Sequence, residues 1–242
     1  MLAIIGGSGL ECLDGFVQIA ELNSDTAYGR PSAPIQRIQY ENREFFFVSR
    51  HGKGHLIAPH RINYRANIDA LSQLGVSEIV AVNAVGGITE PMSPQQLVIP
   101  DQLIDYSYGR DHTFFDIEPV RHIDFTQPFD PVLRQRLSFA AVKAGVSLID
   151  NATYACTQGP RLETAAEVQR LKQDGCDIVG MTAMPEAALA REKGITYACL
   201  ALVVNWAAGV SSDEPVSMDV IEMHMEQGMD RAKTVLKAYL KA

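Results

Sequence analysis

The stretch that most constrains the fold covers residues 157–192 and reads TQGPRLETAAEVQRLKQDGCDIVGMTAMPEAALARE. Thr164 followed by Glu167 forms a capping box, which predicts that a helix begins there, and Gly175 ends that helix. The short apolar segment CDIVGM is typical of a buried parallel strand. Pro185 then suits the first turn of a second helix. Two polar loops therefore flank one buried strand, and α/β sheets bind ligands in such loops.

The same alternation continues on both sides of this stretch. The patterns predict a strand in LAIIGG, a hairpin over 34–40 and 44–49, a helix over 60–75, a strand in EIVAVNAVGGI, a helix over 131–145, a strand in TYACLALVVN and a last helix over about 217–240. Strands that alternate with helices imply a mixed, mostly parallel central sheet with helices on both faces. No linker or repeat divides the chain, so we expect a single α/β domain over residues 1–242.

Composition narrows the kind of partner and compartment. The net charge is −8 and no basic patch stands out, which argues against nucleic acid and membrane surfaces as partners. A local site in an acidic protein can still hold a small anionic substrate. No apolar run reaches the ~18 residues of a membrane span, and Met1 leads directly into a strand, so we expect no signal peptide. The four cysteines are scattered without a CxxC pair, which favours free thiols in a reducing cytoplasm over disulfides or a metal site.

Three segments at predicted strand ends suit the binding of an oxyanion. They are the glycine-rich turn that contains Ser8, the pair Arg50 and His51, and Asn83 with the backbone amide of Ala84. Each also has an ordinary interpretation, as a tight turn, a solvated basic loop and a strand-to-loop turn. From Tyr106 to Pro131 periodicity fails, and long irregular segments of this kind are usually functional or interfacial.

Several motifs in this order resemble a known family. GPRLETAAE, GMTAMPE and VVNWAAG are similar to the trimeric purine nucleoside phosphorylases and methylthioadenosine phosphorylases, and the resemblance extends from GGSGL near the start to VSMD in the last helix. Within that family the chain most resembles the branch that cleaves methylthioinosine. The resemblance implies a homotrimer in which phosphate attacks the anomeric carbon of a purine nucleoside, with inorganic phosphate as co-substrate and no metal or organic cofactor.

The resemblance also implies roles for individual residues. Phosphate binding falls to Ser8, Arg50, His51, Asn83, Ala84 and Thr182, with Asn83 standing where the family commonly has a hydroxyl residue. Met181 packs under the ribose. His122 reaches the 5′ end of the nucleoside in a neighbouring subunit, although a lone histidine in a loop is otherwise a surface residue.

The resemblance implies that four further positions recognise the purine base and the 5′ substituent of the nucleoside. Asn205 can donate to purine N7 and O6, and Glu163 can accept from N1–H of a 6-oxopurine; together with His51 they are the candidate catalytic residues. Family members that act on 6-oxopurines carry Glu and Asn at these two places, and adenine-nucleoside members carry Ser and Asp. Met218 stands where inosine-cleaving members have a histidine, and Ile221 follows one turn later on the same face; both are otherwise core residues of an amphipathic helix.

The preferred function is therefore phosphorolysis of S-methyl-5′-thioinosine. Three alternatives remain open from the sequence. The first is a phosphorylase of inosine and guanosine, or of methylthioadenosine. The second is a nucleotide-binding or regulatory α/β module without turnover, which would not need both Arg50–His51 and the pair of Glu163 with Asn205. The third is a hydrolytic nucleosidase, which would need a carboxylate to activate water.

Overall fold

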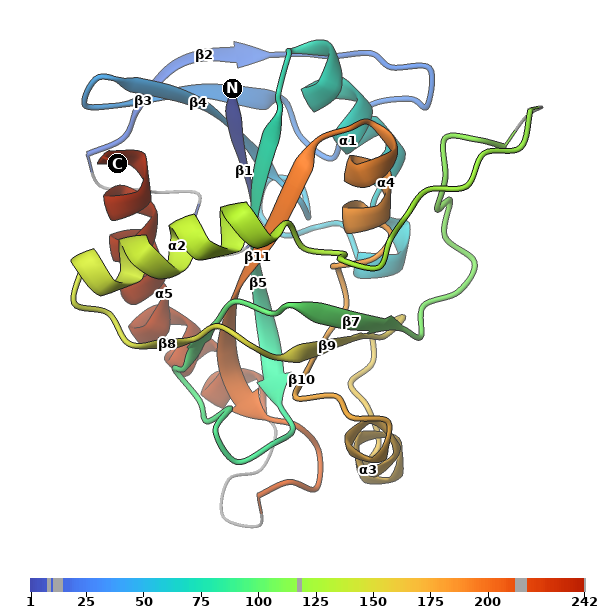
Figure 1. The fold of residues 1–242 in the computed structure, drawn as a ribbon, viewed down its shortest axis with the longest axis vertical. Coiled ribbons are helices and arrows are strands. Elements are labelled where there is room, and N and C mark those ends of the chain that lie inside the picture. Colours follow the sequence, from blue (N-terminus) through green and yellow to red (C-terminus); the bar gives the residue numbers. More distant parts are fainter. Residues whose placement is uncertain (8–9, 11–14, 117–118, 212–216, 242) are drawn as a thin grey trace.

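A mixed eleven-stranded sheet runs through the centre of the molecule, with helices on both of its faces (Figure 1). The structure is a computed structural model and describes residues 1–7, 10, 15–116, 119–211 and 217–241. Its strands are β1 (Leu2–Gly6), β2 (Val17–Leu22), β3 (Ile35–Tyr40), β4 (Arg43–Ser49), β5 (Glu78–Gly87), β6 (Leu97–Val98), β7 (Gln102–Asp105), β8 (Leu148–Ile149), β9 (Thr153–Cys156), β10 (Ile178–Gly180) and β11 (Thr196–Trp206).

The strands follow the order β2-β3-β4-β1-β5-β10-β9-β7, and β11 pairs with β5 and β6. The pairs β1–β4, β1–β5, β5–β11, β7–β9, β9–β10 and β6–β8 are parallel. The pairs β2–β3, β3–β4, β5–β10 and β6–β11 are antiparallel. The prediction of a mixed, mostly parallel α/β sheet is confirmed.

Five α-helices cover the sheet in the described part of the chain: α1 (Tyr64–Gln73), α2 (Pro131–Lys143), α3 (Ala165–Gln173), α4 (Glu186–Glu192) and α5 (Met218–Lys241). Residues of α1 and α4 belong to the core on one face, and residues of α2 and α5 to the core on the other. Successive side chains of a strand point to opposite faces, so in β11 Cys199 and Ala201 belong to the first core and Leu200 and Leu202 to the second. α3 packs at the far end of the molecule (Figure 1).

Helix ends follow the local signals in the sequence. Both hydrogen bonds of the capping box at Thr164 are formed, and Gly175 adopts φ +88° just beyond α3. The last helix begins beside Ser217, whose hydroxyl accepts from the backbone of Val220. The predicted start of the helix at residue 60 is wrong, because Pro59–Arg61 form a 3₁₀ turn and the helix begins after Asn63.

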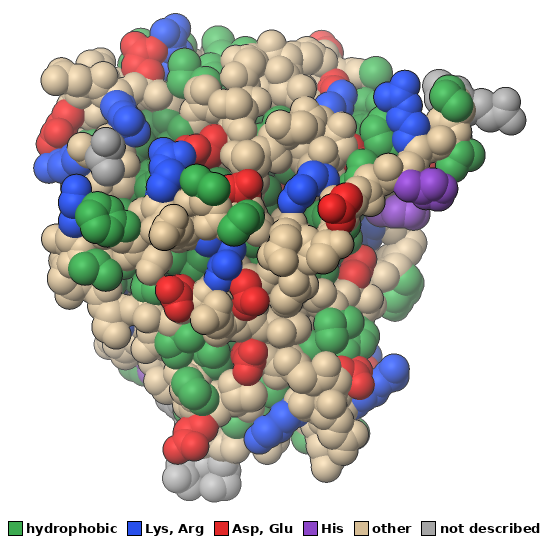
Figure 2. Space-filling model, in the orientation of Figure 1, with side chains coloured by type: hydrophobic (Ala, Val, Ile, Leu, Met, Phe, Trp, Pro, Cys, Tyr) green, Lys and Arg blue, Asp and Glu red, His purple; other side chains and the backbone are tan. Residues whose placement is uncertain are grey.

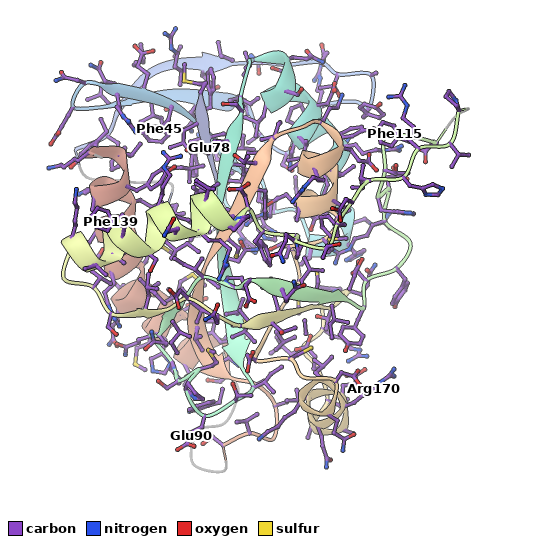
Figure 3. All side chains as sticks on the ribbon, in the orientation of Figure 1. Phe45, Glu78, Glu90, Phe115, Phe139 and Arg170 are labelled. Atoms are coloured by element: carbon purple, nitrogen blue, oxygen red, sulfur yellow. The ribbon has the colours of Figure 1, made fainter. Side chains whose placement is uncertain are left out.

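The stretch between β7 and α2 has no helix or strand in its described residues, as predicted. Figure 1 shows it as an arm that leaves the body of the molecule, and Figure 3 labels Phe115 on it. Figure 2 shows acidic and basic side chains interspersed over the face of the molecule that Figure 1 presents to the viewer. No helix in the described ranges is long and apolar enough to cross a membrane.

Candidate active site

The site lies at a gap in the sheet beside β5. On one edge of β5, β1 pairs only as far as Ala81, and β10 pairs only with Gly86 and Gly87. β1 is parallel to β5 and β10 is antiparallel, so their carboxyl ends approach each other across the unpaired segment 82–85. The carboxyl ends of β4 and β9 lie beside them. Ligands bind outside the carboxyl ends of strands in open α/β sheets, and here four such ends converge.

A cavity of about 690 Å³ occupies this gap. Its lining includes most of the residues that the sequence singled out: Arg50, His51, Asn83, Ala84, Glu163, Met181, Thr182, Asn205, Met218 and Ile221. Gly7 also lines it, whereas Ser8 lies outside the described residues. His122 is exposed on the projecting arm and is not among the lining residues.

Arg50 follows β4 and is 1% exposed. Its Nε and one terminal nitrogen donate to the two carboxylate oxygens of Glu186, each at 2.8 Å, and the other terminal nitrogen donates to the carbonyl of Val82 at 3.0 Å. Val82 belongs to the unpaired edge of β5, so Arg50 satisfies a carbonyl that the sheet leaves free. Three of the five guanidinium N–H groups are used in this way, and the other two form no hydrogen bond with the described residues.

His51 is a neutral imidazole at the wall of the cavity, and its Nε2 is left as an acceptor. Its Nδ1 lies 2.8 Å from the carbonyl of Ile57, so Nδ1 carries the proton, and its ring stacks on His55 at 4.1 Å. Burial lowers the pKa of His51 to about 4; the charges of Arg50 and His55 act in the same direction, and the hydrogen bond to Ile57 opposes them. The imidazole is therefore uncharged near neutral pH.

Asn83 takes part in a directed chain of hydrogen bonds. The Cys199 thiol donates to Asn83 Oδ1 at 3.3 Å, and Asn83 Nδ2 donates to the hydroxyl oxygen of Thr182 at 2.7 Å. Burial raises the pKa of the Cys199 thiol, which keeps its proton. Because Thr182 already accepts from Asn83, its own O–H is available to donate to a ligand in the cavity. Asn83 thus orients the hydroxyl of Thr182.

The sequence places Asn83 and Ala84 at the carboxyl end of their strand, and this is wrong. β5 continues to Gly87 because β11 pairs with it through Trp206. Both residues instead lie in the middle of the strand, beside the gap. Ala84 is the one exposed residue of a strand that is otherwise buried or half-buried, since its position faces the cavity.

Two further lining residues carry polar side chains, Glu163 and Asn205. Glu163 precedes α3 and is half-buried; its Oε1 accepts from the Thr157 hydroxyl at 2.6 Å, and its Oε2 has no hydrogen bond to the described part of the chain. Asn205 follows an irregularity in β11, where the register with β5 shifts between Val203 and Asn205. Such a bulge re-aims the next side chain, and Asn205 lines the cavity. One N–H of its amide donates to the carbonyl of Trp206 at 2.6 Å, and its Oδ1 and second N–H form no hydrogen bond among the residues that the structure describes.

Two glycines lie in close contact with larger side chains at or near the cavity. A Cβ on Gly159, which adopts φ +61°, would lie 2.5 Å from Sδ of Met181. A Cβ on Gly180 would lie 2.0 Å from the hydroxyl oxygen of the fully buried Tyr154. Both distances are shorter than van der Waals contact, so the thioether of Met181 and the ring of Tyr154 depend on these glycines.

The first half of α5 contributes an apolar wall. Met218, Ile221, Met225 and Met229 all line the cavity, with Met218 61% exposed and Ile221 buried. Spacings of three, seven and eleven residues place them along one side of a helix. The motifs in the sequence indicated Met218 and Ile221 but not Met225 or Met229. The recurrence of methionine at this helical spacing could have indicated the other two.

Among the described residues, no group of three or more His, Cys, Asp or Glu side chains could hold a metal ion. The cysteines Cys156, Cys176 and Cys199 are free and buried. The cavity wall carries the guanidinium of Arg50 and the hydroxyl of Thr182, the pair of Glu163 with Asn205, and a methionine-rich surface.

A family model described as the phosphorylase superfamily matches residues 1–241. The chain belongs to this superfamily. It is 52% identical over 242 residues to the probable S-methyl-5′-thioinosine phosphorylase of Pseudomonas syringae pv. tomato, with 99% of this chain and 98% of that protein covered. It is 43% identical to the 6-oxopurine nucleoside phosphorylase of Pyrococcus furiosus, over 98% of this chain and 91% of that protein.

Solved structures place this phosphorylase in the same fold. The methylthioadenosine phosphorylase from Schistosoma mansoni in complex with adenine superposes with a TM-score of 0.94 at 31% identity, covering 99% of this chain and 90% of that chain. A methylthioadenosine phosphorylase from an antarctic soil metagenomic library superposes with a TM-score of 0.93 at 39% identity, covering 99% and 85%. The expected family and fold are both confirmed.

Proposed function

We propose that this phosphorylase cleaves S-methyl-5′-thioinosine with inorganic phosphate, giving hypoxanthine and 5-methylthioribose 1-phosphate. The observation that carries the proposal is the joint presence in one cavity of Glu163 and Asn205 with the apolar wall of α5. The pair of Glu163 with Asn205 suits a 6-oxopurine. The apolar wall of α5 suits a methylthio group. The name of the Pseudomonas syringae relative supports the same substrate.

Phosphate is the nucleophile of the proposed reaction. A phosphate oxygen attacks the anomeric carbon as the bond from that carbon to N9 of the purine breaks, through an oxocarbenium-like state similar to that of glycoside cleavage. The other two N–H groups of Arg50, the O–H of Thr182 and the backbone amide of Ala84 would donate to the phosphate. Nε2 of the neutral His51 would accept from the P–OH group of a monoprotonated phosphate. The charge on Arg50 is balanced by Glu186, so a bound phosphate meets a donor fork of fixed geometry rather than an unpaired cation.

The purine leaves with the electron pair of the broken bond and needs stabilisation as its ring becomes electron-rich. The free N–H of Asn205 would donate to N7 or O6, and Glu163 Oε2 would accept from N1–H. Adenine has no N1–H, so an acceptor on Glu163 would then face an acceptor on the ring. An unmet buried polar group costs ~1–3 kcal/mol, and sites built on such bonds can discriminate by ~10⁴.

We further propose that the active form is a cytoplasmic homotrimer in which one subunit presents His122 to its neighbour. The projecting arm that carries His122 and the exposed side chains of Leu56, Leu162 and Met218 at the cavity support a second copy of the chain there. The free thiols support a reducing compartment. The proposed reaction requires no metal or organic cofactor, because phosphate is the nucleophile and the chain supplies the donors.

The second candidate is a 6-oxopurine nucleoside phosphorylase that acts on inosine and guanosine, as the name of the Pyrococcus furiosus relative suggests. It would share every residue proposed for phosphate and base. It differs only at the 5′ position, where a hydroxyl would lie against α5 without a partner from Met218 or Ile221.

The test is the turnover of methylthioinosine, methylthioadenosine and inosine side by side, each with and without phosphate. We expect base release to saturate with phosphate, to yield a sugar 1-phosphate, and to be fastest with methylthioinosine. Equal rates in phosphate-free buffer would replace phosphorolysis with hydrolysis. A faster rate with inosine would favour the second candidate, and an equal rate with methylthioadenosine would remove the proposed role of Glu163.

A further inference from the structure

Arg110 is a buried arginine outside the cavity, and all of its donors are used. It lies on the arm that follows β7, is 8% exposed, and is not among the described residues that line the cavity. Its Nε donates to the side-chain oxygen of Gln158 at 3.1 Å. One terminal nitrogen donates to the carbonyls of Met181 (2.8 Å) and Met184 and to the hydroxyl of Tyr64 (3.4 Å). The other donates to the carbonyls of Thr157 (3.1 Å) and Gln158 (2.9 Å).

The four backbone carbonyls belong to two separate loops of the site. Residues 157–158 follow β9 and lead to Glu163, the proposed acceptor for the base. Residues 181–184 follow β10, carry Thr182, and lead to Glu186, the partner of Arg50. The guanidinium thus lies between the loop proposed for the base and the loop proposed for ribose and phosphate, and it holds both by their backbones.

The chemistry of the contact explains why an arginine is present. Burying a cation is costly unless it is well hydrogen-bonded, and none of the described carboxylates forms an ion pair with Arg110. Its charge is met by backbone carbonyls and by the ring of Tyr64, whose centroid lies 5.6 Å from the guanidinium carbon. Arginine offers five N–H groups in a fixed plane, whereas lysine offers three from one atom. Only the arginine fork can reach carbonyls on both loops.

One further bond connects Arg110 to the base. The Thr157 carbonyl accepts from Arg110, and the Thr157 hydroxyl donates to Glu163 Oε1 at 2.6 Å. A shift of the 157–158 backbone would therefore move the carboxylate that is proposed to select the purine.

We propose that Arg110 is a positioning residue that fixes the loop of Glu163 relative to the loop of Met181 and Thr182, and thereby sets the selectivity for 6-oxopurines. This inference rests on the proposed function. Arg110 contacts neither reactant; it acts through Thr157 on one side and through the carbonyls of Met181 and Met184 on the other.

The test compares Arg110→Ala and Arg110→Lys with wild type and with Arg121→Ala. Arg121 is the matched control, because it lies on the same arm, is exposed, and contacts only the ring of Phe115 in the described structure. We expect Arg110→Ala to lower kcat/KM for methylthioinosine about 100-fold, since small misplacements of reacting groups cost that much. We expect the ratio of methylthioinosine to methylthioadenosine efficiency to fall about tenfold as the acceptor on Glu163 moves.

Two readouts separate positioning from a loss of folded protein. Millimolar guanidinium ion should restore part of the activity of Arg110→Ala and none of that of Arg110→Lys, whose side chain occupies the space. Hypoxanthine binding, measured by calorimetry on folded samples, should weaken in both variants and not in Arg121→Ala. If Arg110→Ala fails to fold, Arg110→Lys carries the same comparison.

Wild-type efficiency and unchanged selectivity in folded Arg110→Lys or Arg110→Ala would overturn the inference. Wild-type hypoxanthine affinity in both variants would do the same. A wild-type protein that binds hypoxanthine without turnover would instead overturn the proposed function and leave the calorimetric comparison to decide the role of Arg110.

Discussion

Arg50 and Glu186 lie 136 positions apart in the chain and form a fully buried, two-pronged ion pair at 2.8 Å. Tyr197 donates a third hydrogen bond to the same carboxylate. Burial alone would lower the pKa of Arg50, but the neighbouring carboxylate outweighs it and raises that pKa. The pair ties the end of β4 to the start of α4, so the fold itself fixes the orientation of the Arg50 guanidinium at the proposed phosphate site.

Removing Glu186 should be strongly destabilising. Glu186→Ala leaves Arg50 as an uncompensated buried charge, and losses of this kind cost ~3–5 kcal/mol. Urea unfolding followed by circular dichroism measures the change in the free energy of unfolding. Asp25→Ala is the control, because the exposed pair of Asp25 with Arg30 should contribute at most ~1 kcal/mol. Equal unfolding midpoints for Glu186→Ala and wild type would contradict the structural role given to this pair.

Reversing the hydrogen bond between Asn83 and Thr182 should weaken phosphate binding. In Asn83→Asp a carboxylate would accept the O–H of Thr182, so phosphate would meet a lone pair and a negative charge. A lost hydrogen bond to a charged group costs ~1.5–3 kcal/mol, or roughly 10–100-fold in the KM for phosphate. Cys199→Ser keeps a donor to Asn83 Oδ1 and should change that KM little. An equal KM for phosphate in Asn83→Asp and wild type would contradict the proposed orientation of the Thr182 hydroxyl by Asn83.

His51 should make stability depend on pH in a defined window. Its pKa is about 4 in the folded protein and about 6.5 when unfolded, so the unfolded chain takes up a proton first as the pH falls. The free energy of unfolding should therefore be unaffected by His51 above pH 6.5 and should decline between about pH 6.5 and 4, by up to ~3 kcal/mol. Urea unfolding at several pH values measures the slope.

His51→Asn is the matched variant for this slope, because its amide can replace Nδ1–H as the donor to Ile57 but does not titrate. The difference in stability between wild type and variant should shrink, or change sign in favour of the variant, as the pH falls through this window. A constant difference from pH 7 to 4.5 would mean that His51 is protonated equally in both states.

Met218 should decide between a 5′-methylthio and a 5′-hydroxyl group. Burial of a methylthio group against α5 gains ~0.8 kcal/mol per methylene-sized unit, and a hydroxyl without a partner loses ~1–3 kcal/mol. These terms suggest a preference of wild type for methylthioinosine over inosine of about two to three powers of ten in kcat/KM, at 1.4 kcal/mol per tenfold. Met218→His should gain on inosine and lose on methylthioinosine.

The control for this exchange is Met223→His. Met223 lies on the same helix, is exposed, and does not belong to the cavity lining in the described structure. Its substitution should leave the ratio of the two nucleosides unchanged. Identical shifts in Met218→His and Met223→His would attribute the effect to the helix rather than to the pocket.

The sequence predicted what depends on local signals. The capping box at Thr164, the stop at Gly175 and the buried run of β11 are each encoded within a few residues, and all three were confirmed. β2 was not predicted, because its side chains are mostly exposed and alternate weakly; it is a strand because β3 pairs with it. Long-range pairing also extends β5 past Asn83, which no local pattern indicates.

The candidate site divides in the same way. Motifs identified the segments that line the cavity, including those of Glu163 and Asn205. They did not indicate the hydrogen bonds that hold these segments in place. Glu186, Thr157 and Arg110 act through contacts with residues that only the folded chain brings together.

The contact between Gly180 and Tyr154 restricts the order in which this site can change. A methyl group at position 180 has no room while the tyrosine ring is present, with the hydroxyl oxygen at 2.0 Å and the adjoining ring carbon at 2.7 Å. Gly180→Ala should therefore fail alone and be tolerated only after Tyr154 has been shortened, for example to leucine. A series of substitutions that places a larger residue at position 180, whether made in the laboratory or acquired in evolution, therefore has to begin with a smaller residue at position 154.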